Sequence, residues 1–411
     1  MSNLGSLVDF GVTRARFVTI LLIILNAFTW YLVAFEVLAY LINTSSMTTH
    51  EITVIWAIHF GGLTCAALVG ATLSNRLVSR NNLLALWMSL GLVSSLVPMI
   101  IGTTCTISIV AFSLLLGVAF GLGMPSCMGY YADFTRIEKR GRFGGVIYFA
   151  IGIGTSLLWT TLIPFVYLAE QLLILTIWRG FGLAIFLVLR PKDRYAQVRA
   201  CATKNPSYIA ILRRKPLLLY FIPWIMFCLI SSLTRPILLP DVVHMSMVIG
   251  SITTGLAALL GGLFSDLVGR KRVVIAGFAM LGIGYAILGI FPDHPISYYL
   301  FTLVGSIAWG MFGAVFLMAL WGDLAEDMAP EKFYAIGGLP YLLTGFLDIL
   351  IAPYISELIP LSATFSLASF FLFLAVFPLL FAPETLPEKK IKERELKKYI
   401  EKAKKIKEKY D

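Results

Sequence analysis

The residues best suited to chemistry in this sequence are two carboxylic acids within long apolar stretches, Asp348 and Glu36. An ionisable group surrounded by hydrocarbon costs on the order of a few kcal/mol or more, so each needs a compensating role. Thr344 and Tyr341 precede Asp348 by four and seven residues, which places the three side chains on one face of a helix. Because burial favours the neutral acid, Asp348 is predicted to take up and release a proton. An acid held by a fixed base or a helix terminus is the alternative.

His59 is the histidine best placed to work with Glu36. Glu36 lies about two-thirds across the apolar stretch 17–42, and His59 about a third of the way into the next stretch, 52–76. Consecutive stretches that cross a membrane run antiparallel, so the two side chains are expected at similar depth. A carboxylate–imidazole pair there could carry a proton, because an imidazole titrates near neutral pH. A static hydrogen-bonded pair, or side chains that face outwards near the headgroups, is the alternative.

Arg235 is a further charged group in an apolar stretch, near one end of residues 216–240 and directly before Pro236. It is expected to pair with Asp348 or to bind an anionic substrate, and an anchor at the membrane interface is the alternative. The five cysteines are scattered, and no cluster of residues has metal-ligand spacing. The sequence therefore predicts no metal and no cofactor.

These charged residues must be carried by secondary-structure elements that are stable inside hydrocarbon. The composition indicates which kind of element this is. Of 411 residues, 58% are hydrophobic and 14% are charged, whereas ordinary globular chains are roughly half apolar and a quarter charged. Apolar runs of about 18 residues or more recur, and each is long enough to cross a bilayer as a helix. The runs lack the two-residue alternation of a barrel strand. The predicted fold class is an all-α polytopic membrane protein.

Twelve membrane-spanning helices are predicted, six on each side of a basic central segment. The expected spans are residues 17–42, 52–76, 83–101, 107–131, 144–168, 172–190, 216–240, 245–264, 273–291, 298–320, 336–359 and 362–381. The expected organisation is an N-terminal six-helix bundle (1–189), a cytoplasmic basic linker (190–215), a C-terminal six-helix bundle (216–382) and a charged cytoplasmic tail (383–411).

The net charge of +10 indicates orientation in the membrane. With these spans, all of the 33 Lys and Arg except Arg179 and Arg235 fall on one side. Such a bias marks the cytoplasmic side, so both termini are expected in the cytoplasm and the charge is no sign of nucleic-acid binding. The protein is expected to cross the lipid bilayer of the cell membrane many times, as a monomer.

The two halves share short sequence features at matching positions, which indicates duplication. Ser74 to Arg80 follows the second span much as Ser265 to Arg270 follows the eighth. Ala132-Asp133 follows the fourth span as Gly322-Asp323 follows the tenth, and a Gly-Gly pair opens the next span in each half. The two six-helix bundles are therefore expected to be pseudo-symmetric.

The stretch between the eighth and ninth spans places an acid and a basic run in a very short loop. It resembles the signature loop G-x-x-x-D-x-x-G-R-[RK] of the major facilitator superfamily of secondary transporters, at Gly262, Asp266, Gly269, Arg270 and Lys271. The resemblance implies two six-helix bundles that rock around a central cavity. Other segments look like the sugar-porter and metabolite:proton symporter branch, namely Gly117 to Gly123, Tyr131-Ala132-Asp133, Arg140-Gly141-Arg142 and Pro383-Glu384-Thr385.

The resemblance also implies a cytoplasmic gate, where this loop latches the two halves together in the outward-open state. Asp266 is expected to bridge Arg270 or to cap a neighbouring helix N-terminus, and acids after the tenth span are expected to hold Arg270 and Lys271. The expected gate residues are Gly262, Asp266, Gly269, Arg270, Lys271, Asp323, Glu326, Asp327, Arg76, Arg80, Asp133 and Arg140. The family lines its cavity with the first, fourth, seventh and tenth spans. The cavity candidates are Asn26, Trp30, Trp224 and Trp309.

The predicted function is secondary active transport, not enzymatic catalysis. The expected solute is small and polar, such as a sugar, an organic acid or a similar metabolite, moved by alternating access with proton coupling. The seventh span lacks the paired glutamines with which sugar porters hold a sugar, and the fifth lacks the Gly-Pro-x-x-Gly-Gly pattern of drug antiporters. A facilitative uniporter or a drug antiporter is the alternative within transport. A transport-dead receptor or a membrane-embedded enzyme is the alternative from another class.

Overall fold

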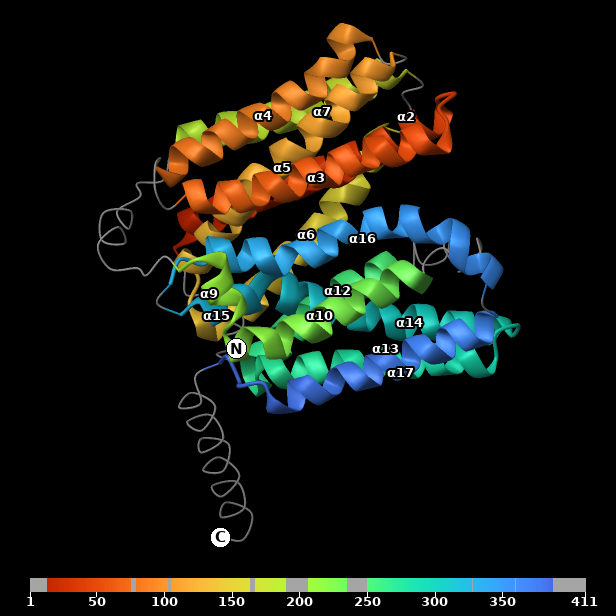
Figure 1. The fold of residues 1–411 in the computed structure, drawn as a ribbon. Coiled ribbons are helices and arrows are strands. Elements are labelled where there is room, and N and C mark those ends of the chain that lie inside the picture. Colours follow the sequence, from red (N-terminus) through yellow and green to blue (C-terminus); the bar gives the residue numbers. More distant parts are fainter. Residues whose placement is uncertain are drawn as a thin grey trace.

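The computed structural model is a bundle of long helices (Figure 1). It describes residues 13–74, 79–102, 105–162, 167–189, 206–234, 250–326, 328–358 and 360–386. Within these residues, twelve helices are long and apolar enough to cross a membrane, which confirms the predicted fold class. Most of the expected linker and the tail beyond residue 386 lie outside the described residues.

The first six spans form one group, drawn in red to yellow-green in Figure 1. They are α2 (Arg14–Thr44), α3 (Thr49–Leu73), α4 (Arg80–Ile101), α5 (Thr106–Phe134), α6 (Ile137–Leu162) and α7 (Leu168–Leu189). In this half α5 packs along α3 and α4, and α2 lies against α6 and α7.

The second group is drawn in green to blue, below the first in Figure 1. It comprises the short α9 (Tyr208–Leu212) and the spans α10 (Lys215–Thr234), α12 (Ser251–Val268), α13 (Arg270–Ile290), α14 (Pro295–Phe312) with its continuation η3 (Gly313–Leu320) and α15 (Trp321–Ala325), α16 (Glu331–Leu358) and α17 (Leu361–Phe381). Here α13 packs against α14 and α17, and α10 against α16 and α17.

The halves meet mainly where α6 lies along α12 and η3 and where α16 lies along α3 and α5. Small residues allow the α6–α12 backbones to touch. A Cβ atom at Gly145 would lie 3.1 Å from the carbonyl carbon of Ala258, and one at Gly262 would lie 3.2 Å from the Cα of Gly145. Larger side chains at these positions would push the helices apart. The fifth and eighth spans, and the second and eleventh, therefore form the seam between the halves.

Several helices begin earlier than the hydrophobic pattern predicts. α6 begins at Ile137 instead of residue 144, α4 at Arg80 instead of residue 83, and α16 at Glu331 instead of residue 336. The extra first turns carry charged side chains that are buried and paired inside the protein. Apolar content alone therefore underestimates the helices at this end.

Candidate functional site

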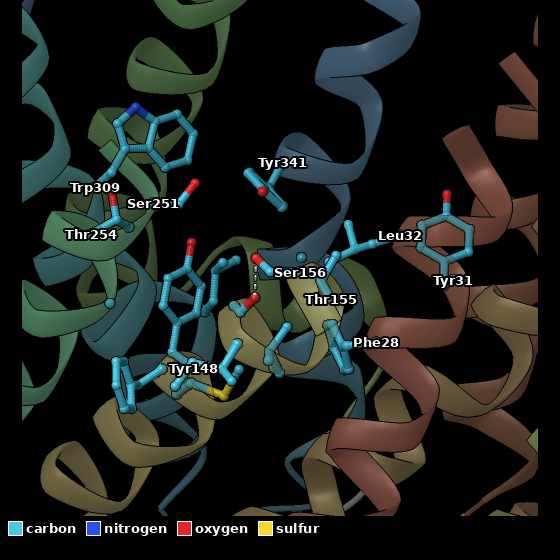
Figure 2. Close-up of a pocket in the computed structure, with 18 of the residues that line it drawn as sticks. Phe28, Tyr31, Leu32, Tyr148, Thr155, Ser156, Ser251, Thr254, Trp309 and Tyr341 are labelled. Atoms are coloured by element: carbon cyan, nitrogen blue, oxygen red, sulfur yellow. Dashed lines mark hydrogen bonds between the residues drawn. The ribbon is translucent and has the colours of Figure 1, made fainter. Parts of the chain in front are cut away.

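A cavity of about 770 Å³ lies between the two halves (Figure 2). One wall comes from α2, α5 and α6, and the other from α12, α14, η3, α15 and α16. Its volume is within the range of roughly 300–1,000 Å³ that is usual for small-molecule sites. The cavity is thus large enough to hold a small organic molecule between the halves.

The walls of this cavity are mainly aromatic and aliphatic. Trp309 and Tyr341 meet edge to face with their ring centroids 5.9 Å apart, and Tyr31 stacks on Phe120 at 3.8 Å. Hydroxyl groups such as that of Tyr148 supply most of the polar character. Among the described lining residues there is no Asp, Glu, Lys, Arg or His.

Three of the four aromatic and amide residues predicted for the cavity lie elsewhere. Trp309 is on the cavity wall, but Asn26, Trp30 and Trp224 are buried within their own halves. The indole N–H of Trp30 donates to the Ser95 hydroxyl (2.9 Å). That of Trp224 donates to the carbonyl of Gly337 (2.8 Å). The rings of Trp30 and Trp224 are turned into the helix packing of their own halves, so these residues and Asn26 are not among the described lining residues of this cavity.

Asn26 instead serves a buried cation that the sequence analysis did not select. Its side-chain oxygen accepts a hydrogen bond from the Nη1 of Arg179 in α7 (2.9 Å). The Arg179 guanidinium is 0% exposed and lies between the rings of Trp30 and Trp87, at 5.0 and 4.7 Å from their centroids. Its Nε and Nη2 have no hydrogen-bond partner within the described part of the chain. Cation–π contacts therefore provide much of its stabilisation.

His59 is fully buried, and both its ring nitrogens are occupied. Nδ1 lies 2.9 Å from the carbonyl oxygen of Ser113, and Nε2 lies 3.1 Å from the hydroxyl of Tyr31. A carbonyl only accepts, so Nδ1 carries the proton and Nε2 accepts from Tyr31. Glu36 lies on an exposed face of α2. The predicted Glu36–His59 pair is therefore not formed, and Tyr31, which lines the cavity, takes the place of the carboxylate.

Asp348 lies in α16, partly buried, one turn beyond Thr344. The Thr344 hydroxyl donates to the carbonyl of Tyr341 within the same helix (2.7 Å). Of these three residues, Tyr341 lines the described cavity. Arg235, the predicted partner of Asp348, lies outside the described residues.

One end of the bundle, which we call the ion-pair end, is closed by buried charges; it is the end near α9 and α15 in Figure 1. Arg80 at the start of α4 pairs with Asp133 in its own half (Nη1–Oδ2 2.6 Å) and with Glu331 of α16 in the other half. The Glu331 carboxylate is fully buried. This contact connects the start of the third span to the start of the eleventh span.

A second cluster is centred on Asp323, at the end of the tenth span. Its carboxylate binds Arg270 of its own half (Nε–Oδ2 3.0 Å) and Arg140 of α6 in the other half (Nη1–Oδ1 2.5 Å). Asp323–Arg270 repeats the Asp133–Arg80 pair at the matching place in the duplicated half. The pseudo-symmetry expected from the sequence therefore extends to individual ion pairs.

The third cluster joins Asp266 of α12 to the first turns of α6. Its two carboxylate oxygens accept the backbone N–H groups of Gly141 (2.9 Å) and Arg142 (2.8 Å), and it also pairs with Arg270. Arg270 in turn donates to the carbonyl of Ile137, one turn earlier in α6 (2.7 Å). The structure thus places both alternatives, the bridge to Arg270 and the contact with a neighbouring helix start, on the same carboxylate. A Cβ at Gly141 would lie 2.7 Å from an Asp266 oxygen, so the contact requires glycine.

Other expected gate residues have lesser or different contacts. Lys271 donates to the carbonyl of Leu380 (2.7 Å) and not to the acids after the tenth span. Glu326 pairs with Arg214 at 3.4 Å and is largely exposed. Gly269 makes the turn between α12 and α13 at a φ of 108°, which favours glycine. Arg76 and Asp327 lie outside the described residues.

Two residues of the ion-pair end were missed by sequence reasoning. Glu331 looks like one more charge in a polar turn, and its partner Arg80 is 251 residues away. Glu384 accepts the N–H of Arg270 (2.8 Å) and of Lys271 (3.2 Å), and so closes the start of α13. The sequence did contain a signal for Glu384, namely the segment Pro383-Glu384-Thr385. It contained no signal for Glu331, which is not one of the acids repeated at matching positions in the two halves.

Comparison with known proteins agrees with this architecture. A sequence model of the Major Facilitator Superfamily matches residues 238–409. The fold is similar to that of a proton:xylose symporter, XylE, solved with 6-bromo-6-deoxy-D-glucose (TM-score 0.66, 16% identity, 90% of this chain and 96% of that one). It is also similar to the human organic anion transporter MFSD10 (TETRAN) (TM-score 0.60, 16% identity, 90% of this chain and 98% of that one). No curated protein matches the chain by sequence.

These observations define a multi-pass membrane protein with a transporter fold, in which two six-helix halves enclose a cavity. The family model matches residues 238–409, which include the signature loop, and the chain as a whole shares the fold of solved transporters of that superfamily.

Proposed function

We propose that this protein is a secondary transporter that moves a solute across the cell membrane by alternating access. The observation that carries the proposal is the combination of a cavity between the halves with an end sealed by ion pairs that cross between them. The basic ion-pair end faces the cytoplasm in this proposal, as the positive-inside bias favours. The structure then represents a conformation closed to the cytoplasm.

Opening the ion-pair end would separate partners that are now dehydrated. Asp266, Asp323 and Glu331 are each fully buried and each contacts the opposite half. Removing one partner of a buried pair leaves an uncompensated charge, which typically costs about 3–5 kcal/mol. Opening instead exposes both partners to water, so the closed and open states can be similar in free energy. That balance is what a two-state carrier requires.

Proton coupling is part of the proposal, with Asp348 and His59 as the groups involved. Asp348 supplies the carboxylic acid within a span, and His59 supplies an imidazole whose Nε2 is separated from the cavity by the Tyr31 hydroxyl. A proton that reaches His59 from the cavity would pass through the position of Tyr31. Facilitative uniport is the alternative, and it predicts net movement that persists when the proton gradient is collapsed.

The alternating-access proposal can be tested without knowing the solute. Two spin labels at Arg136 and Lys215, both exposed, report on the ion-pair end, and two at Glu170 and Asp293 report on the opposite end. The labels are placed in a background without the five native cysteines, in lipid nanodiscs. Pulsed electron paramagnetic resonance then gives the distance distribution for each pair.

In this experiment Asp266→Asn is expected to add a longer distance at the ion-pair end and a shorter one at the opposite end. The reason is that the variant loses the charge that binds Gly141, Arg142 and Arg270. Glu138→Gln, on α6 at the same end, is the matched control and should leave both distributions unchanged. Lengthening at both ends together, or no new population, would contradict the proposal.

A further inference from the structure

One cluster of hydroxyl groups in the cavity lies beside Trp309. Figure 2 shows the hydroxyl groups of Tyr148 of α6 and of Ser251 and Thr254 of α12 near Trp309 of α14. The α2 side of the cavity presents Phe28 and Leu32, together with Tyr31, whose hydroxyl is already bound to His59. A molecule that fills this space meets hydrogen-bonding groups on one side and hydrocarbon on the other.

The cavity offers little to a charged solute. The described lining residues include no acid and no base, and the ion pairs of Asp266, Asp323 and Glu331 belong to the closed end. A charge that leaves water without a partner is strongly disfavoured in an apolar site. These walls therefore favour a neutral molecule over an anion or a cation.

The same walls suit a sugar poorly. Among the described lining residues there is no Asn or Gln, and the Ser156 hydroxyl already donates to the carbonyl of Gly152 (3.0 Å). Every buried hydroxyl of a solute that finds no partner costs about 1–3 kcal/mol. A polyol facing Phe28 and Leu32 would leave several hydroxyls unpaired.

The unused polar groups of the cavity include donors that lack an acceptor. The indole N–H of Trp309 and the hydroxyl of Tyr148 line the cavity and make no hydrogen bond within the described part of the chain. The indole N–H of Trp321 also lacks a partner there, but it is fully buried and is not accessible from the cavity. An indole N–H can only donate. Oxygen atoms that accept hydrogen bonds are the chemistry that would satisfy these groups.

We infer that this cavity takes neutral, largely apolar molecules with an aromatic or fused-ring body and hydrogen-bond-accepting oxygens, such as aryl ketones, quinones or esters. The inference rests on the proposed function, since it names the substrate class of that same cavity. It replaces the small polar solute expected from the sequence with a less polar one.

The test uses naphthalene derivatives that share one ring system and differ in the attached group. The probes are 2-acetonaphthone (a neutral ketone), 2-naphthoate (an anion), 2-naphthylmethylammonium (a cation) and 2-ethylnaphthalene (no acceptor), with xylose as a polyol. Equilibrium dialysis measures binding to the full-length protein in nanodiscs, and empty nanodiscs correct for partition into lipid. The ketone is expected to bind at least about tenfold more tightly than the anion, the cation or xylose, which is about 1.4 kcal/mol.

Two glycine variants show whether binding is in the cavity. Gly152 lines the cavity, and a Cβ there would meet no atom within 4 Å, so Gly152→Phe fills the space without a backbone clash. Gly61 on α3 has the same open surroundings outside the described cavity lining, so Gly61→Phe is the matched control. Ketone binding should be lost in Gly152→Phe and kept in Gly61→Phe. Trp309→Phe should weaken the ketone several-fold and leave 2-ethylnaphthalene unchanged.

The outcomes separate this inference from the proposed function. Tight binding of the anion, the cation or xylose that Gly152→Phe abolishes would overturn the substrate class and leave the cavity as the transport site. Ketone binding that is equal in Gly152→Phe and wild type would place the probe outside the cavity, which would overturn the inference and leave the alternating-access proposal to the spin-label distances. Equal loss of ketone and 2-ethylnaphthalene in Trp309→Phe would refute the role of the acceptor oxygen.

Discussion

At the scale of single residues, Arg179 shows how this protein holds a cation without a carboxylate. The guanidinium lies between Trp30 and Trp87 and donates its described hydrogen bond to the Asn26 side-chain oxygen. Two flat rings on either side of a flat cation give a geometry that only arginine satisfies. Gly91 supports the arrangement, since a Cβ there would lie 2.7 Å from the Arg179 Nε.

This geometry predicts an unusual order of stability among Arg179 variants. Arg179→Lys keeps the charge but loses planar stacking on both indoles, so it is expected to lose about 2 kcal/mol or more. Arg179→Met removes the buried charge and keeps most of the volume, so it should be closer to wild type. Thermal unfolding of the purified protein gives the order. A lysine variant as stable as wild type would contradict the role assigned to the two rings.

Asp348 carries a prediction about coupling that is also confined to one side chain. Asp348→Asn keeps the shape and cannot ionise, so a proton gradient should no longer drive accumulation while exchange of solute across the membrane remains. Proteoliposomes loaded with a pH-sensitive dye, with a solute that the wild-type protein binds, measure both processes. Asp293→Asn, an exposed acid, is the control. Full gradient-driven uptake in Asp348→Asn would exclude this residue as the coupling group.

At the scale of helices, the N-terminus of α13 depends on a residue from beyond the last span. Glu384 accepts the first two N–H groups of α13, and it lies against Gly269, where any Cβ would meet its carboxylate. A carboxylate at a helix start satisfies otherwise unpaired donors and interacts favourably with the helix dipole. The same turn carries Arg270, so this contact also positions the ion-pair end.

Glu384→Ala is therefore expected to destabilise the protein by about 1 kcal/mol, in the range usual for a lost helix cap. Glu384→Gln keeps an acceptor oxygen and should have a smaller effect. Glu326→Ala is a suitable control, because Glu326 is 68% exposed and its pair with Arg214 is at the surface. Thermal melting temperatures compare the three variants. Equal losses in Glu384→Ala and Glu326→Ala would show that Glu384 is an ordinary surface charge.

The spans and the signature loop were predictable because both are local patterns. Long apolar runs define the spans, and the spacing of Gly262, Asp266, Gly269 and Arg270 defines the loop. The helix starts at the ion-pair end were less predictable, since hydropathy treats a buried, paired arginine such as Arg80 as a solvent-exposed one. Long-range partners carry no local signal.

The cavity residues were the least predictable part of the site. A membrane helix is apolar on the face that meets lipid as well as on the face that meets protein, so its hydrophobic pattern does not tell which face borders a cavity. Trp30 and Trp309 are both tryptophans within spans, yet only Trp309 lines the cavity. The distinction depends on helix rotation, which three-dimensional packing decides.

At the scale of the whole molecule, the two halves are joined along packed helices and at the ion-pair end. The α6–α12 and α3–α16 pairs hold the halves together along their length, and the ion pairs of Arg80, Arg140 and Asp266 join them at one end. Because Asp266, Asp323 and Glu331 each bind a group of the opposite half, separating the halves at this end breaks all of these contacts together. Rocking of rigid halves is consistent with this arrangement.

If the protein alternates as proposed, the ion-pair end also makes its conformational equilibrium sensitive to heat. Hydration of charged groups becomes less favourable as temperature rises, so exposing Asp266, Asp323 and Glu331 to water costs more in a warm membrane than in a cold one. Warming should therefore increase the share of molecules in the sealed conformation. The spin-label pair at Arg136 and Lys215, followed over a temperature series, measures that share directly. A growing share of the long distance on warming would show that hydration of these charges does not set the balance.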